Sequence, residues 1–72
     1  MKDLLIKDLE GILQGNVTIK QWNNENEVYK ILYSSTHFQV FYLSEELQNM
    51  VITSIYVDQE DVEQNFIIVE VE

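Results

Sequence analysis

The spacing of apolar residues changes once along the chain, from a helical to a strand pattern. In residues 3–14 the apolar side chains recur at intervals of three and four, as Leu5, Ile6, Leu9, Ile12 and Leu13. Such spacing places them on one face of an α-helix. Asp3 can cap the start of this helix and Gly15 can end it. We therefore predict an amphipathic helix over 3–14, with a close packing contact at Gly11.

From residue 17 onward, apolar and polar residues alternate with a period of two, which is typical of β-strands. Val17 and Ile19 are expected to face inward, with Trp22 in the opposite phase. The pattern places Tyr29, Ile31 and Tyr33 on a common face. One stretch is apolar on both faces and is therefore predicted to be a central strand. The predicted strands are 17–22, 27–34, 37–43 (the central one), 50–57 and 66–72.

Polar segments separate these strands. Residues 23–26 and 34–36 have the composition of turns. Ser44 followed by acidic residues indicates a helical start over 44–48, about one turn long. The acidic segment 58–65 is expected to be a connection with one helical turn. These connections are too short for parallel crossovers, which need a dozen or more residues.

The predicted architecture is a single α+β domain over residues 1–72, in which the N-terminal helix packs on an antiparallel meander of four or five strands. A chain of 72 residues supports only a thin core. The residues expected to build it are Leu5, Leu9, Ile12, Ile19, Ile31, Val40, Ile55 and Val69.

Charge changes the picture most. The chain has 13 acidic residues, four lysines and no arginine, for a net charge of −9. Residues 31–72 contain eight acids and no base. Such a surface disfavours direct binding to nucleic acid, whose phosphates it repels, and attracts basic surfaces. High negative charge can equally serve only to keep a small protein in solution.

Candidate catalytic and metal-binding residues are few. The absence of cysteine excludes disulfides and thiolate sites, and His37 is the only histidine. His37 follows a run of hydroxyl residues, but the chain has no nucleophile-elbow motif. The acidic residues from Asp58 to Glu63 lack both the spacing and the glycine of a calcium loop. We therefore expect no enzymatic activity, no cofactor and no metal site.

The chain contains no apolar run long enough to span a membrane, and its N-terminus does not have the pattern of a signal peptide. Together with the absence of cysteine, this favours a cytoplasmic location without membrane binding.

In size, acidity and the order of a helix (Leu4–Leu13) followed by strands (from Val17-Thr18-Ile19-Lys20), the chain resembles small acidic inhibitors encoded by bacteriophages, including anti-CRISPR proteins and other DNA mimics. The resemblance implies that it blocks the basic groove of a nucleic-acid-binding protein, such as a CRISPR effector nuclease. The residues predicted to bind the partner are the carboxylates and two aromatic anchors, namely Glu45, Glu46, Asp58, Glu60, Asp61, Glu63, Glu70, Glu72, Trp22 and Tyr56.

An alternative function predicts the same composition. In it the chain is a small interaction subunit, such as an antitoxin, an immunity protein or a homo-oligomeric accessory protein. A sheet edge or an apolar patch would then carry the binding, with charge only at the rim. Carboxylates gathered on one face would favour the inhibitor, and scattered carboxylates beside an apolar patch would favour the subunit.

Overall fold

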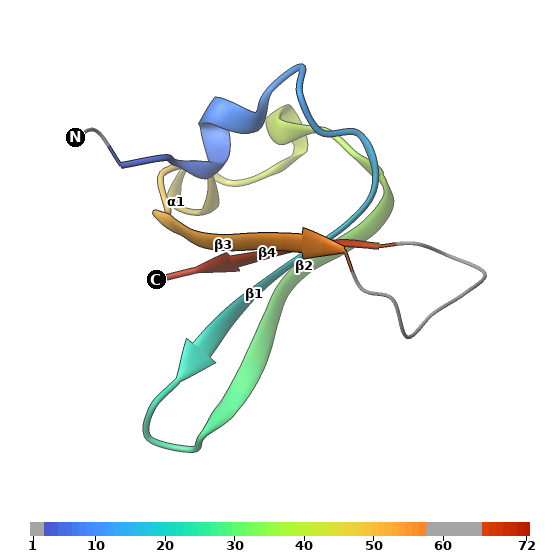
Figure 1. Cartoon of the computed structure of the whole chain (residues 1–72). Coiled ribbons are helices and arrows are strands. Elements are labelled where there is room, and N and C mark those ends of the chain that lie inside the picture. The colour runs from blue at the N-terminus through green and yellow to red at the C-terminus, as the bar shows by residue number, and fades with distance from the viewer. Residues whose placement is uncertain (1–2, 58–65) are drawn as a thin grey trace.

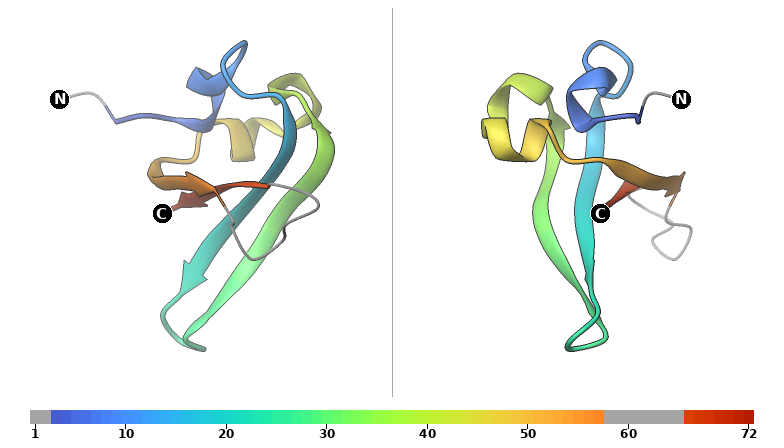
Figure 2. Two further views of the ribbon diagram at one scale, coloured as in Figure 1. Left: turned by 45° about the vertical axis from the view of Figure 1, so that its right-hand side comes forward. Right: turned by 90° about the vertical axis from the view of Figure 1, so that its left-hand side faces the viewer.

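The computed structural model describes residues 3–57 and 66–72, and the predicted connection 58–65 lies outside them. The α+β fold class is confirmed (Figure 1). The described residues form a four-stranded sheet and three short helical segments. The helical segments gather on one side of the sheet (Figure 2). In chain order the elements are η1 (Ile6–Leu9), β1 (Gly15–Asn23), β2 (Val28–Phe38), η2 (Val40–Tyr42), α1 (Glu45–Gln48), β3 (Ile52–Val57) and β4 (Ile67–Val71).

The sheet is mixed, which corrects the prediction of an antiparallel meander. Its strand order is β2-β1-β4-β3. β1 pairs with β2 and β4 pairs with β3 in antiparallel fashion, whereas β1 and β4 run parallel. The prediction considered only strands that are consecutive in sequence, where a short connection excludes parallel pairing. β1 and β4 are separated by two other strands, so the chain between them is long enough to bring them side by side.

The N-terminal α-helix predicted over 3–14 is reduced to η1, a 3₁₀ turn. Its cap is Leu5, not Asp3: the Leu5 N–H donates to Asp8 Oδ2 at 2.9 Å. Before η1 the chain is extended and bonded to the start of β3, where the Ile52 N–H donates to the Leu4 carbonyl at 2.8 Å. After η1, Gly11 adopts a left-handed conformation with φ of 77°. Sheet pairing on one side and a glycine turn on the other therefore limit the helix.

Gly11 is not a packing contact, because a Cβ built there would meet no atom within 4 Å. The residue serves the backbone conformation of the turn. Gly15, predicted to end the helix, instead begins β1 with φ of 88°.

The middle of the chain also differs from the prediction. The expected turn 34–36 lies within β2, and the expected central strand 37–43 ends at Phe38. The chain then forms η2, because Val40 and Leu43 are buried while the residues between them are exposed. An apolar run on both faces indicated a central strand, but a turn that buries only its two ends has the same composition. The predicted helical start is confirmed, since Ser44 Oγ accepts from the Leu47 N–H.

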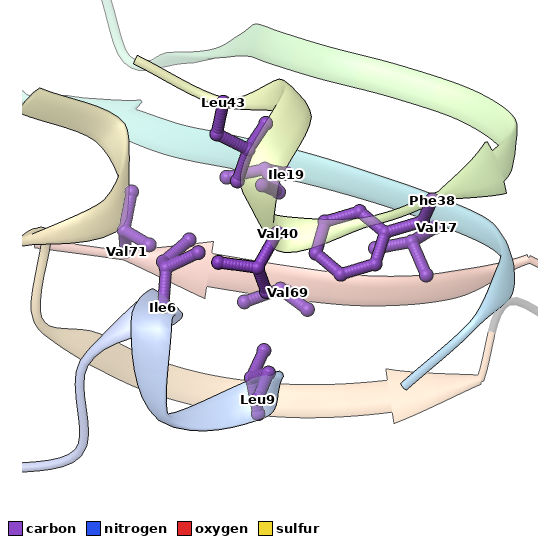
Figure 3. Packing of buried hydrophobic residues seen from close by; sticks show 9 residues of the cluster. All are labelled: Ile6, Leu9, Val17, Ile19, Phe38, Val40, Leu43, Val69 and Val71. Carbon is purple, nitrogen blue, oxygen red and sulfur yellow. The ribbon is translucent and has the colours of Figure 1, made fainter. Parts of the chain in front are cut away.

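The core lies between the helical layer and the sheet (Figure 3). The sheet contributes residues of β1 and β4 and the last residue of β2, and the helical layer covers them. The buried cluster comprises Ile6, Leu9, Val17, Ile19, Phe38, Val40, Leu43, Val69 and Val71. Four of the eight predicted core residues are in it, namely Leu9, Ile19, Val40 and Val69.

The other four predicted core residues are not fully buried. Leu5 is half-buried. Ile12 is 72% exposed, because the chain turns at Gly11 before it can return to the core. Ile31 and Ile55 are exposed on β2 and β3, the two edge strands, each of which has a strand neighbour on one side only.

Replacing Leu9 with Ala should lower the free energy of unfolding by about 2–5 kcal/mol, because it leaves a cavity under η1. Ile12→Ala is the matched control, because Ile12 is exposed on the turn that follows η1. This substitution should change the free energy of unfolding by less than about 0.5 kcal/mol. Urea denaturation followed by circular dichroism measures both. Equal effects of the two substitutions would show that η1 does not pack as described.

Deleting residues 66–72 should abolish cooperative unfolding, because in the described sheet β4 lies between β1 and β3 and joins them. Without it, β3 loses its partner and β1 loses one side. The measurement is a thermal melt of the truncated chain. A sharp transition in that melt would contradict the central position of β4.

Candidate functional site

The sheet has a second face, directed away from the helical layer, which we call the outer face. Side chains alternate along a strand, so burial of Val17 and Ile19 directs Thr18, Lys20 and Trp22 to the outer face. In β4 the same rule directs Ile68 and Glu70 outward. Ile68 is buried although it does not belong to the main core cluster.

A bulge in β2 changes which residues face outward. Ile19 is opposite Tyr33, but Lys20 is opposite Ile31, so Leu32 is the extra residue. Tyr33 consequently points to the core side, where its ring contacts that of Phe38. Tyr29 and Ile31 lie on the outer face, contrary to the expectation that all three would share one face. The alternation pattern could not show this, because a single inserted residue inverts every side chain beyond it.

Each strand contributes a residue to a row across the outer face. Lys20 of β1 lies between two tyrosines, with its Nζ 4.0 Å from the ring centre of Tyr29 on β2 and 5.4 Å from that of Tyr56 on β3. Glu70 of β4 completes the row, with its Oε1 4.0 Å from the Lys20 Nζ. Together with Trp22, these residues form what we call the outer-face cluster.

Trp22 is held in place from two sides. Its ring meets that of Tyr29 in an edge-to-face contact, with the centroids 4.9 Å apart. Its Nε1–H donates to Asn24 Oδ1 at 2.7 Å, within the turn that joins β1 to β2. An open groove beside it is lined by Gln21, Trp22, Asn23, Asn24, Glu25 and Lys30. The indole is therefore 44% exposed and yet fixed in orientation.

The centre of the cluster is electrically neutral. Lys20 and Glu70 carry opposite charges, and Glu70 Oε1 is buried without a hydrogen-bond partner in the part of the chain that the structure describes. Interaction with the Tyr56 side chain raises the pKa of Lys20, and the charge of Glu70 adds a smaller increase. The neighbouring Glu70 carboxylate raises the pKa of Tyr29. Both shifts favour the protonated form, so at neutral pH the lysine is charged and Tyr29 is protonated.

The structure brings only some of the predicted partner-binding residues together. Trp22 and Tyr56, 44% and 39% exposed, lie on the outer face with Glu70. Glu45 and Glu46 are exposed on α1, in the helical layer on the other side of the sheet. The exposed Glu72 follows the end of β4, and the remaining four carboxylates, Asp58, Glu60, Asp61 and Glu63, lie outside the described residues.

Sequence reasoning missed Lys20 and Tyr29. Lys20 lies two residues before Trp22 and therefore on the same face of the strand, so the alternation pattern contained a signal for Lys20. Tyr29 had no comparable signal, because its place beside Trp22 depends on the pairing register of β1 with β2.

In residues 3–57 and 66–72, no three potential metal ligands lie close enough together to hold an ion. Within the same ranges, no helix has the length and apolar character needed to cross a membrane.

Comparison with protein-family models, with curated proteins and with solved structures gives no match.

Replacing Glu70 with Gln should lower the pKa of Tyr29 toward the ordinary tyrosine value of 10.0, because the acceptor that favours the protonated phenol loses its charge. Carbon-13 NMR titration of labelled tyrosine measures this. Glu45→Gln is the control, since Glu45 lies on the opposite side of the sheet and should leave the titration unchanged.

The sign of the pH effect on stability follows from the same shift. A group whose pKa is raised in the folded state stabilises the fold below its unfolded pKa, and loses that effect as the pH rises through its folded pKa. The raised pKa values of Tyr29 and Lys20 both place this loss above pH 10.0. An unchanged Tyr29 titration in the Gln variant would show that the two side chains do not interact.

Proposed function

We propose that the protein is a small interaction subunit that binds another protein through the outer face of its sheet. The observation that carries the proposal is the outer-face cluster, in which rings from three strands surround a neutral ion pair on the side that the helical segments leave bare. Trp and Tyr dominate the binding energy of many protein interfaces, because they bury a large area at little cost in conformational entropy.

The carboxylates support the subunit better than the nucleic-acid mimic. A mimic needs several uncompensated charges on one surface, at intervals that match phosphates. Among the described carboxylates, Glu70 is compensated by Lys20, while Glu45 and Glu46 project from the opposite layer. These groups do not form one array. The mimic remains a hypothesis that rests on net charge and on the residues from 58 to 63.

The partner is a different protein and not a second copy of the chain. Two copies would each carry a charge of −9, and their mutual repulsion opposes association. A partner of lower charge, with an apolar surface, avoids this cost and fits the neutral cluster.

The test is quantitative capture from a lysate of the source organism on immobilised protein, with bound proteins identified by mass spectrometry. Trp22→Ser with Tyr56→Ser should reduce the capture of a specific partner at least about 10-fold, because loss of a buried aromatic anchor costs about 2 kcal/mol or more. Ile12→Ser is the control, because it introduces the same side chain at an exposed position away from the cluster.

A second variant separates the two functions. Neutralising Asp58, Glu60, Asp61 and Glu63 to Asn and Gln should leave most of the capture intact if the cluster carries it. The nucleic-acid mimic would replace the subunit as the proposed function if capture were lost in this variant and in about 1 M salt but survived the double Ser substitution. Salt at this concentration screens the long-range attraction between charges on which a mimic depends.

A further inference from the structure

The helical layer carries a second exposed aromatic pair, on the side of the sheet opposite the outer-face cluster. Phe41 and Tyr42 of η2 are 66% and 62% exposed, and their ring centroids lie 4.3 Å apart. Phe is among the residues most often buried in folded proteins, and Tyr is intermediate. Here the flanking Val40 and Leu43 are buried, which anchors the turn and leaves the two rings in solvent.

Hydrogen bonds join η2 rigidly to α1. Gln48 Nε2 donates to the Leu43 carbonyl at 2.9 Å and to the Val40 carbonyl at 3.3 Å. Ser44 Oγ caps the start of α1, and Asn49 Nδ2 donates to the Glu45 carbonyl at 2.8 Å. The two rings are thus presented on a fixed scaffold. A fixed scaffold lowers the entropy cost of binding, because little remains to be ordered.

The charge beside the rings is negative and uncompensated. Glu45 and Glu46 lie in the first turn of α1, beginning three residues after Tyr42, and both are exposed. Among the residues that the structure describes, neither forms an ion pair with a lysine. We name the segment 41–46, with its two rings and two carboxylates, the aromatic–acidic ridge.

We propose that the aromatic–acidic ridge docks onto a basic protein surface, with Phe41 and Tyr42 entering an apolar pocket and Glu45 and Glu46 pairing with lysine or arginine at its rim. The rings supply the affinity, because buried aromatic anchors dominate interfaces, and the carboxylates select the charge of the partner. The net charge of −9 steers a basic partner toward the protein from a distance. The ridge and the outer-face cluster lie on opposite sides of the sheet, so this proposal does not depend on the function proposed above.

The experiment is selection of a random-peptide display library on the purified, immobilised protein. Enriched peptides should combine an apolar residue with lysine or arginine. Their binding should fall at least about 10-fold with Phe41→Ser plus Tyr42→Ser, which removes the anchors. With Glu45→Gln plus Glu46→Gln it should fall by a smaller factor, about two- to fivefold, because rim ion pairs are worth about 0.2–1 kcal/mol each.

A control makes the outcome decisive. Ile12→Ser should leave binding unchanged, because Ile12 is at least as exposed as the two rings but lies outside both the ridge and the outer-face cluster. All five substituted positions are exposed, so the variants should fold, and circular dichroism checks that they do. Failure to enrich any peptide, enrichment of peptides without basic residues, or binding that all variants share would overturn the proposal.

Discussion

The parallel pairing of β1 with β4 is the constraint on which the rest of the structure depends. It places the C-terminal strand at the centre of the sheet, between the β1–β2 hairpin and β3. In that position β4 supplies Val69 and Val71 to the core on one face and Glu70 to the outer-face cluster on the other. Without this pairing the helical layer would have no continuous sheet to cover, and Lys20 would have no carboxylate beside it.

Much of the local structure could be predicted from the sequence, because it depends on near neighbours. The alternation of Val17 and Ile19 indicated β1, and Ser44 followed by two glutamates indicated α1. What failed depends on contacts that are distant in sequence. Leu4 and Leu5 have a helical pattern but pair with the start of β3. The bulge at Leu32, which decides that Tyr29 faces outward, has no signature in the order of residues.

The same distinction applies to the candidate site. Trp22 and Tyr56 were identified as anchors by their residue type, and Trp22 also by its strand phase, and the structure places them on one face. That Lys20 lies between Tyr29 and Tyr56 follows from the registers of three strand pairs, which no periodicity encodes. Net charge was a poor guide to geometry, because it counts carboxylates without saying which of them a lysine compensates. Glu70 shows this, since a charge that looked available is the partner of Lys20.

The central position of β4 also has a consequence for biosynthesis. The hairpin and the helical turns are made first, but the sheet cannot close until residues 67–71 have been synthesised. Until then Val17, Ile19 and Phe38 have no strand to complete the core beneath them. A growing chain in this state exposes apolar surface and unpaired strand edges, which are the features that chaperones bind and that lead to aggregation. The 11 acids and four lysines that precede residue 66 give such an incomplete chain a net charge of −7, and this charge opposes the association of two incomplete chains.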